Sequence, residues 1–275
     1  MNSSFNIITP GADTTLSTLL IEISTQGISY IAVNGQNTCI ALSVYHFDAG
    51  ITNDQVADNL KTIVSNQPVL QQPFKKVNIV YVFAEAVLVP HEFSNVQANE
   101  AMVELVYGDI ADSITRYDFI NKHHLHNIYR VPKQIDSVIT HLFTQANHYH
   151  LYSLLPDIIK ATGNKLYCIF SPKNITIQLI KEGKLQVIQS FVYKVPEDAV
   201  YHLLNVCESF DVPVTNTEIQ LSGMIDTHSN LYNELYKYFL HLSFVALPET
   251  FTYNDEIKKY PSHYFSHLFQ LVACV

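Results

Sequence analysis

The sequence feature that most constrains the fold is a three-stranded β-meander pattern that occurs twice. In each copy, three short runs rich in β-branched and aromatic residues are separated by turns that contain Gly, Asn or Pro. The predicted strands are 19–24, 28–33 and 38–47 in the first copy, and 166–170, 175–180 and 185–191 in the second. This spacing predicts consecutive antiparallel hairpins, and its repetition predicts two similar domains.

The elements predicted after the two meanders follow the same order. Apolar residues at helical spacing predict a helix at 53–65, capped by Asn53 or Asp54, and another at 196–210, where Pro196 suits the first turn. A strand and a second helix are predicted after each of these helices, at 77–83 and 95–107 in the first half and at 217–221 and 229–242 in the second. The chain is therefore predicted to contain two β-β-β-α-β-α units.

The stretch from His148 to Thr162 has no counterpart in the other half of the repeat. It ends at Thr162-Gly163-Asn164, which interrupts the apolar pattern. We therefore predict a first domain at 14–147, an interdomain connection at 148–163 and a second domain at 164–275.

Charge and hydropathy exclude several classes of protein. The formal net charge is −9, and the 16 Lys and Arg residues are scattered along the chain, so we expect no nucleic-acid partner. The apolar run Phe239–Leu247 is too short to span a bilayer, and Met1–Thr15 lacks the pattern of a signal peptide. These features predict a cytoplasmic protein without a membrane span.

The cysteines agree with that location. None forms a CxxC pair, and each stands alone in an apolar stretch, so we expect four buried thiols in a reducing compartment. They are Cys39, Cys168, Cys207 and Cys274.

A β-β-β-α-β-α unit in both halves resembles the actin-like ATPase fold of actin, heat-shock chaperones and sugar kinases. More narrowly, the chain is similar to an uncharacterised family of Bacteroidetes proteins in that superfamily, through Val87–Pro90, Asn127–Pro132 and Pro261–Phe265. The resemblance implies an α/β fold of two duplicated ribonuclease H-like domains. Each would contain a mixed sheet flanked by helices, and a cleft would separate the domains.

The resemblance also implies where a nucleotide would bind. In active members, ATP lies in the interdomain cleft, a turn from each meander holds its phosphates, and a Gly-Gly turn contacts the adenosine. A carboxylate there would organise Mg²⁺. The matching positions here are Glu22, Ser24 and Thr25 in the first turn, Ser171 and Lys173 in the second, and Ser222 and Gly223 in the third.

These positions match the active pattern poorly. Ser24 stands where glycine would allow the closest approach to phosphate, and Pro172 removes a backbone donor from the second turn. The 8 glycines form neither a GxGxxG nor a P-loop motif. We therefore predict no catalytic residue and no cofactor, and an ATP and Mg²⁺ site is not supported.

Closely spaced histidines are the other candidates for chemistry. They are His123, His124 and His126, with His148 and His150. An i, i+2 pair such as His124 and His126 would lie on one face of a strand. No Cys, Asp or Glu stands at a compact ligand spacing beside them, and no HExxH motif is present. Structural or surface roles are favoured over a metal site.

Three hypotheses follow. The leading one is a catalytically degenerate actin-like protein, a binding or assembly module that contacts protein partners or itself and is not an enzyme. The alternative is a residual nucleotide-binding protein, kinase or ATPase that uses the interdomain cleft, with Glu22 and Lys173 in place of the usual groups. The third is a histidine-based metal protein.

Overall fold

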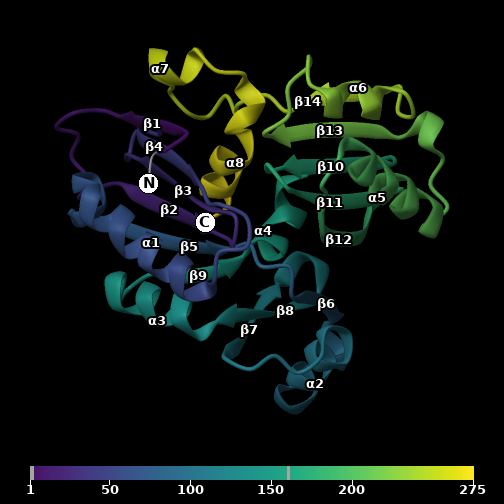
Figure 1. The fold of residues 1–275 in the computed structure, drawn as a ribbon, viewed down its shortest axis with the longest axis horizontal. Helices are drawn as coiled ribbons and strands as arrows, with labels where there is room; N and C mark the ends of the chain where they lie inside the picture. The colour runs from purple at the N-terminus through teal and green to yellow at the C-terminus, as the bar shows by residue number, and fades with distance from the viewer. Residues whose placement is uncertain (1–2, 160–161) are drawn as a thin grey trace. The chain divides into compact units, whose positions relative to one another are not determined.

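The chain forms two compact units in the computed structural model, which describes residues 3–159 and 162–275 (Figure 1). The first unit comprises Met1–Leu154, Thr250–Asn254 and Val275, and the second comprises Leu155–Glu249 and Asp255–Cys274. In the described residues, no helix is long and apolar enough to cross a membrane.

The first unit contains a six-stranded sheet with the order β1-β4-β3-β2-β5-β9. Its strands are β1 (Phe5–Ile8), β2 (Thr18–Ile23), β3 (Gly27–Val33), β4 (Cys39–His46), β5 (Lys76–Tyr81) and β9 (Asn147–His150). The meander β2-β3-β4 is antiparallel, whereas β5 pairs with β2, and β9 with β5, in parallel. Their inward residues, such as Leu19, Ile21 and Ile79, are fully buried. This confirms the predicted first meander and the strand after it.

Helices α1 (Asn53–Asn66) and α3 (Lys133–Leu142) lie side by side in this unit (Figure 1). Helix α1 buries Val56, Leu60 and Ile63, as its apolar spacing predicts. The predicted cap at Asn53 or Asp54 is wrong, because Thr52 caps the helix instead. Its side chain accepts from the Gln55 N–H while the Gln55 side chain accepts from the Thr52 N–H, so two unpaired donors are satisfied together.

The first unit also contains a three-stranded sheet, which the sequence repeat did not predict. Its strands β6 (Ala86–Pro90), β8 (Leu125–Pro132) and β7 (Ser113–Ile120) are antiparallel in the order β6-β8-β7. Helix α2 (Val96–Tyr107), capped by Asn95, packs on β6 and β8 (Figure 1). We call this part, residues 86–132, the small sheet region.

The second unit contains a five-stranded sheet with the order β12-β11-β10-β13-β14. Its strands are β10 (Lys165–Phe170), β11 (Asn174–Lys181), β12 (Lys184–Val192), β13 (Glu218–Gly223) and β14 (Leu242–Phe244). An antiparallel meander is again followed by a helix, α5 (Pro196–Ser209), and by a strand parallel to its first member. This confirms the second copy of the repeat.

Two predictions for the second unit are wrong. The helix predicted at 229–242 ends at Tyr236 as α6 (Asn230–Tyr236), because Leu242–Phe244 instead pairs in parallel with β13. Cys274 is exposed near the end of α8 (Ser266–Cys274), whereas the other three thiols are buried as predicted. Both errors concern segments whose environment depends on distant parts of the chain.

The expected connection at 148–163 contains regular structure. His148–His150 belong to β9, and helix α4 (Leu151–Ile158) follows directly. The two compact units divide within that helix, between Leu154 and Leu155.

Candidate functional site

The first candidate phosphate turn joins β2 to β3, and three of its backbone N–H groups are bonded within the turn. The Ser24 hydroxyl oxygen accepts from the N–H groups of Gln26 at 3.1 Å and Gly27 at 3.2 Å. The Ser24 N–H donates to the Gly27 carbonyl at 3.0 Å. Thr25 is exposed at the tip. Ser24 therefore replaces a ligand as the acceptor for two of the N–H groups of this turn.

Glu22 is half-buried near the end of β2. Loss of water around its carboxyl raises its pKa to about 7. The carboxylate form that Mg²⁺ requires is therefore only partly populated at neutral pH.

The second candidate turn joins β10 to β11 and is also closed by its own contacts. The Ser171 N–H and hydroxyl both donate to the Asn174 carbonyl, at 2.8 and 3.2 Å. The Tyr193 hydroxyl donates to the Ser171 carbonyl at 2.7 Å, and the Tyr193 N–H donates to the Lys173 carbonyl at 2.9 Å. Lys173 itself is exposed.

Ser222 and Gly223 end β13, beside the second turn, because Phe170 pairs with Gly223 across the parallel strands. Gly223 has φ +82°, and a Cβ there would lie 2.2 Å from the Phe170 carbonyl oxygen. Strand packing thus explains this glycine without a ligand. Ser222 is buried, and its hydroxyl bonds to Ser266 at 2.8 Å and to the His263 carbonyl at 3.2 Å.

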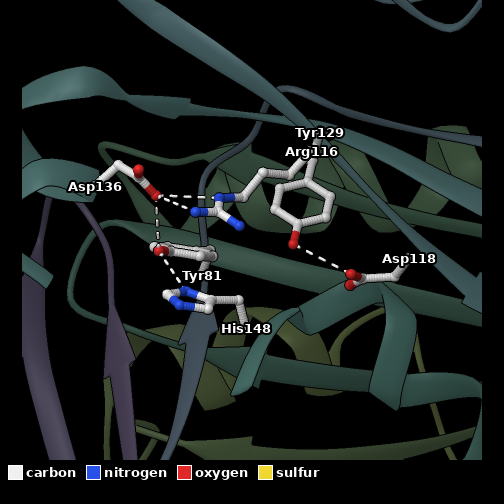
Figure 2. A network of polar contacts seen from close by, with 6 residues as sticks. All are labelled: Tyr81, Arg116, Asp118, Tyr129, Asp136 and His148. Carbon is white, nitrogen blue, oxygen red and sulfur yellow. Dashed lines mark hydrogen bonds and ion pairs between the residues drawn. The ribbon is translucent and has the colours of Figure 1, made fainter. Parts of the chain in front are cut away.

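A polar network in the first unit was missed by the sequence reasoning (Figure 2). Arg116 on β7 donates to one carboxylate oxygen of Asp136 on α3, through Nε at 3.0 Å and through a terminal nitrogen at 2.7 Å. The Tyr81 hydroxyl on β5 lies 3.3 Å from the same oxygen and 2.9 Å from His148 Nδ1. Burial and the negative charge of Asp136 raise the Tyr81 pKa, so its hydroxyl stays protonated as a donor.

Asp118, also on β7, accepts three hydrogen bonds in the same region. Its oxygens accept from the Ser153 hydroxyl at 2.6 Å and from the His150 N–H at 2.8 Å. They also accept from the Tyr129 hydroxyl at 3.2 Å (Figure 2). Burial raises the Asp118 pKa even though these donors oppose the shift. Asn127 on β8 extends the network through a bond to the Ser153 hydroxyl at 2.9 Å.

The network therefore joins the small sheet region to the six-stranded sheet. Strands β7 and β8 contribute Arg116, Asp118 and Tyr129, and β5, α3, β9 and α4 contribute the partners. Each of these side chains has at least one protein partner, and within the described residues the buried Asn127 Oδ1 is left without one. Mutual pairing of most groups is the arrangement expected of a structural polar network. Tyr129 and Asn127 lie in Asn127–Pro132, one of the segments that carry the resemblance to the uncharacterised family. The sequence thus singled out two residues of the network but did not indicate which residues they contact.

The candidate metal ligands around His124 do not form a ligand set. His124 has a left-handed backbone (φ 51°) after the short helix that contains His123, so the proposed His124 and His126 pair does not share a strand face. His126 Nε2 instead bonds to His91 Nδ1 at 2.8 Å. Within the described part of the chain, no three His, Cys, Asp or Glu residues are placed to hold a metal ion.

Both ring nitrogens of His150 are engaged by the backbone. Nε2 lies 2.9 Å from the Phe83 carbonyl oxygen, which can only accept, so Nε2 carries the proton. Nδ1 accepts from the Tyr152 N–H at 3.2 Å. His150 is fully buried as a neutral ring, and burial lowers its pKa to about 4. His148, the other candidate here, bonds to Tyr81.

We expect His150 to make the protein less stable in acid. Between its unfolded pKa of about 6.5 and its folded pKa of about 4, the unfolded chain binds a proton that the folded chain does not. Stability should therefore fall as the pH drops through this window, by up to about 3 kcal/mol from this residue. Urea unfolding should show that the free energy of unfolding declines less between pH 7 and pH 4 for His150→Asn than for the parent.

The matched control for that titration is His228→Asn, at an exposed position. It should leave the pH dependence of the unfolding free energy within error of the parent. Identical slopes for His150→Asn and the parent would contradict the neutral buried ring.

Comparison with known proteins supplies the fold family. The model of a family described as "Protein of unknown function (DUF3822)" matches residues 10–242. No curated protein matches the chain. A Bacteroides thetaiotaomicron protein with an actin-like ATPase fold and unknown function is similar in structure, with a TM-score of 0.76 and 21% identity over 94% of this chain and 96% of that one.

Two further solved structures are more distant. The PilM-PilN type IV pilus biogenesis complex matches with a TM-score of 0.63 and 11% identity over 96% of this chain and 99% of that one. The ethanolamine utilization protein EutJ of Carboxydothermus hydrogenoformans matches with a TM-score of 0.52 and 7% identity, over 98% of this chain and 93% of that one. At these identities the likeness concerns the fold alone.

Proposed function

Since the chain belongs to the family of proteins of unknown function DUF3822 and has an actin-like ATPase fold, we propose that it is a protein-binding or assembly module that has lost nucleotide hydrolysis. The observation that supports this proposal is the closure of the phosphate turns. Ser24 accepts the hydrogen bonds of Gln26 and Gly27, and Ser171 donates inward to Asn174. The N–H groups of Ser24, Gln26, Gly27 and Ser171 are already paired within the turns, so they are not available to a triphosphate.

The glycines at these positions support the same proposal. A Cβ at Gly27 would lie 2.2 Å from the Tyr45 carbonyl oxygen, and one at Gly223 would lie 2.2 Å from that of Phe170. The backbone of a neighbouring strand therefore leaves no room for a side chain at either position, so neither glycine needs a bound phosphate to explain it. The fold of the PilM-PilN complex is compatible with a role in protein assembly, and a protein partner for this chain is part of our proposal.

We expect Mg-ATP to leave the thermal stability of the protein unchanged. A site with a Kd of about 10 µM would stabilise the fold by about 2.7 kcal/mol when the free ligand concentration is about 100 times the Kd. Differential scanning fluorimetry with millimolar Mg-ATP and Mg-ADP should show no shift in Tm, and isothermal titration should show no saturable heat.

The alternative, a residual nucleotide-binding protein or kinase, makes the opposite prediction. It would use Glu22 and Lys173, so saturable Mg-ATP binding that Lys173→Ala weakens would support it and contradict our proposal. Because the Glu22 pKa is raised to about 7, such binding should also strengthen as the pH rises from 6 to 8.

A further inference from the structure

Strand β7 ends the sheet of the small sheet region, and in the part of the chain that the structure describes no strand pairs with its outer edge (Figure 1). Even-numbered residues of β8 bond to β6, as the Arg130 N–H does to the Glu85 carbonyl, so the odd-numbered residues of β8 bond to β7. Their partners on β7 are the even-numbered residues. The N–H and C=O groups of Thr115, Tyr117 and Phe119 therefore face the open edge.

This edge is more accessible than the other sheet edges among the described residues. Tyr117 and Phe119 are 59% and 44% exposed. Strands β1, β9 and β14 also end sheets but have four residues or fewer, and β6 ends in Pro90, which has no N–H to donate. Strand β12 is longer, but Ile188, whose backbone faces its outer edge, is only 4% exposed. An unpaired strand edge is a ready template for another strand.

The polar network holds β7 in position. Its even-numbered side chains lie on the face opposite Tyr117. Arg116 bonds to Asp136 on α3, and Asp118 accepts from the Ser153 hydroxyl on α4. A strand that is already held in its extended conformation loses little conformational entropy when a partner pairs with it.

The sequence of β7 is complementary to itself in one antiparallel register. Residues whose backbone groups face the open edge must pair with residues of the same kind, so odd positions pair with odd positions. When Tyr117 lies opposite Tyr117 of a second copy, Arg116 lies opposite Asp118, and Thr115 lies opposite Phe119. Opposite charges and aromatic or β-branched pairs stabilise neighbouring strands when they face each other.

The neighbouring registers place like charges together. Centring the pairing on residue 116 or 118 puts Arg116 opposite Arg116 or Asp118 opposite Asp118. One further step in either direction puts Asp118 opposite Asp112, or Arg116 opposite Lys122. Like charges directly opposite each other destabilise paired strands. The charges along β7 thus favour a single register, and they favour a second copy of the chain as the partner.

We propose that β7 pairs antiparallel with β7 of a second copy about a twofold axis at Tyr117, so that two small sheet regions form one continuous sheet. This inference rests on the proposed function and specifies the partner. Tyr117 would exchange both N–H···O bonds with its counterpart, and Thr115 with Phe119 of the second copy. The pairing uses the open edge of both copies, so it closes at a dimer. An interface confined to strand edges is small, and we expect a micromolar Kd.

A cysteine at the twofold axis tests the register directly. In a Cys274→Ser background, which removes the exposed native thiol, Tyr117→Cys should form an intermolecular disulfide under mild oxidation. The reason is that the Cα atoms of a hydrogen-bonded antiparallel pair are about 5.5 Å apart, within the range of a disulfide. Phe119→Cys is the matched control, because its two copies would lie about 14 Å apart. Non-reducing gel electrophoresis should show a dimer for Tyr117→Cys and a monomer for Phe119→Cys.

Sedimentation velocity on the full chain measures the association itself. The parent should show a monomer–dimer equilibrium in the micromolar range. Tyr117→Lys would place two cations opposite each other and should weaken dimerisation about tenfold or more. The matched control is Tyr201→Lys, at a tyrosine of α5 that is 64% exposed, and it should change the Kd less than twofold.

Thr115→Pro tests the contribution of the backbone. It removes an N–H that faces the open edge and keeps the bonds to β8, and proline is tolerated on an edge strand at such positions. Dimerisation should weaken about tenfold, whereas Thr115→Val, which keeps the N–H, should stay within twofold of the parent. Far-ultraviolet circular dichroism shows whether Thr115→Pro folds, and Tyr117→Lys, a surface change, decides the question if it does not.

A parent that stays monomeric throughout the micromolar range would overturn the inference. So would a dimer that Tyr117→Lys leaves intact, or equal cross-linking by Phe119→Cys. Species larger than a dimer that Tyr117→Lys abolishes would also contradict it, because twofold pairing leaves no edge of β7 open. Saturable Mg-ATP binding would instead contradict the proposed function and leave the cross-linking unchanged, so the two failures are distinguishable.

Discussion

Replacing Gly223 by alanine should lower the free energy of unfolding by about 3 kcal/mol. Two effects add at this position. A Cβ would lie 2.2 Å from the Phe170 carbonyl oxygen and 3.0 Å from the Phe170 nitrogen, so the paired strands β10 and β13 must separate. The residue also has φ +82°, which L-residues adopt at a cost of about 1 kcal/mol or more. Overpacking of this kind costs about 1–3 kcal/mol. Urea unfolding monitored by circular dichroism measures the loss.

Two other glycines separate the steric effect from the backbone effect. Gly50 has φ +79° and nothing within 4 Å of an added Cβ, so Gly50→Ala should cost only about 1 kcal/mol. At Gly27, which is not in the left-handed region, the added Cβ would lie 2.2 Å from the Tyr45 carbonyl oxygen. Gly27→Ala should therefore cost about 2 kcal/mol. A Gly223→Ala loss no larger than that of Gly50→Ala would contradict the steric argument.

Replacing Asp118 by alanine should cost about 3 kcal/mol and loosen the small sheet region. The change leaves three donors without their acceptor, the Ser153 hydroxyl, the His150 N–H and the Tyr129 hydroxyl. Each unsatisfied buried donor costs about 1–3 kcal/mol, reduced where water can enter. Urea unfolding measures the total loss of stability. The substitution should also accelerate amide hydrogen exchange more in β7 and β8 than in β2.

Asp118→Asn is the informative comparison for that experiment. One amide oxygen can still accept from Ser153 and His150, and the Tyr129 hydroxyl can accept from the amide nitrogen. We therefore expect a loss of about 1 kcal/mol. Asp109→Ala, at an exposed position, should change stability by less than about 0.5 kcal/mol. An Asp118→Ala loss below that of Asp118→Asn would show that the network does not stabilise the fold.

The repeated part of the fold could be predicted from sequence because its signals are local. Turn residues and apolar spacing predicted both meanders, both helices that follow them and the parallel strands β5 and β13. In the small sheet region the helix predicted at 95–107 is present as α2, but the three strands were not predicted, since β7 joins β8 through a short helix rather than a recognisable hairpin turn. The N-terminus of α1 shows that sequence did not resolve the capping residue, because Thr52 and the two residues after it are all of types that cap helices.

The candidate site was only partly visible in the sequence. His148 and His150 were identified as weak candidate metal ligands for which structural or surface roles were favoured, but their partners lie far away in the chain. Tyr81 is 67 positions from His148, and Arg116 is 20 positions from Asp136. No local pattern signals such contacts, because they form only when β5, β7, α3 and β9 are packed together.

The sequence by itself determined the order of elements in the two repeated β-β-β-α-β units, because each of their strands, turns and helices depends on residues close together in the chain. Only the tertiary structure decided how the polar groups of that fold are used. Strand pairing at Tyr45 and Phe170 requires glycine at positions 27 and 223. Packing of the small sheet region engages Asp118 and leaves Tyr117 exposed. Hydrogen bonds and burial depend on which distant segments meet, so the same residue types could have served a ligand or the fold itself.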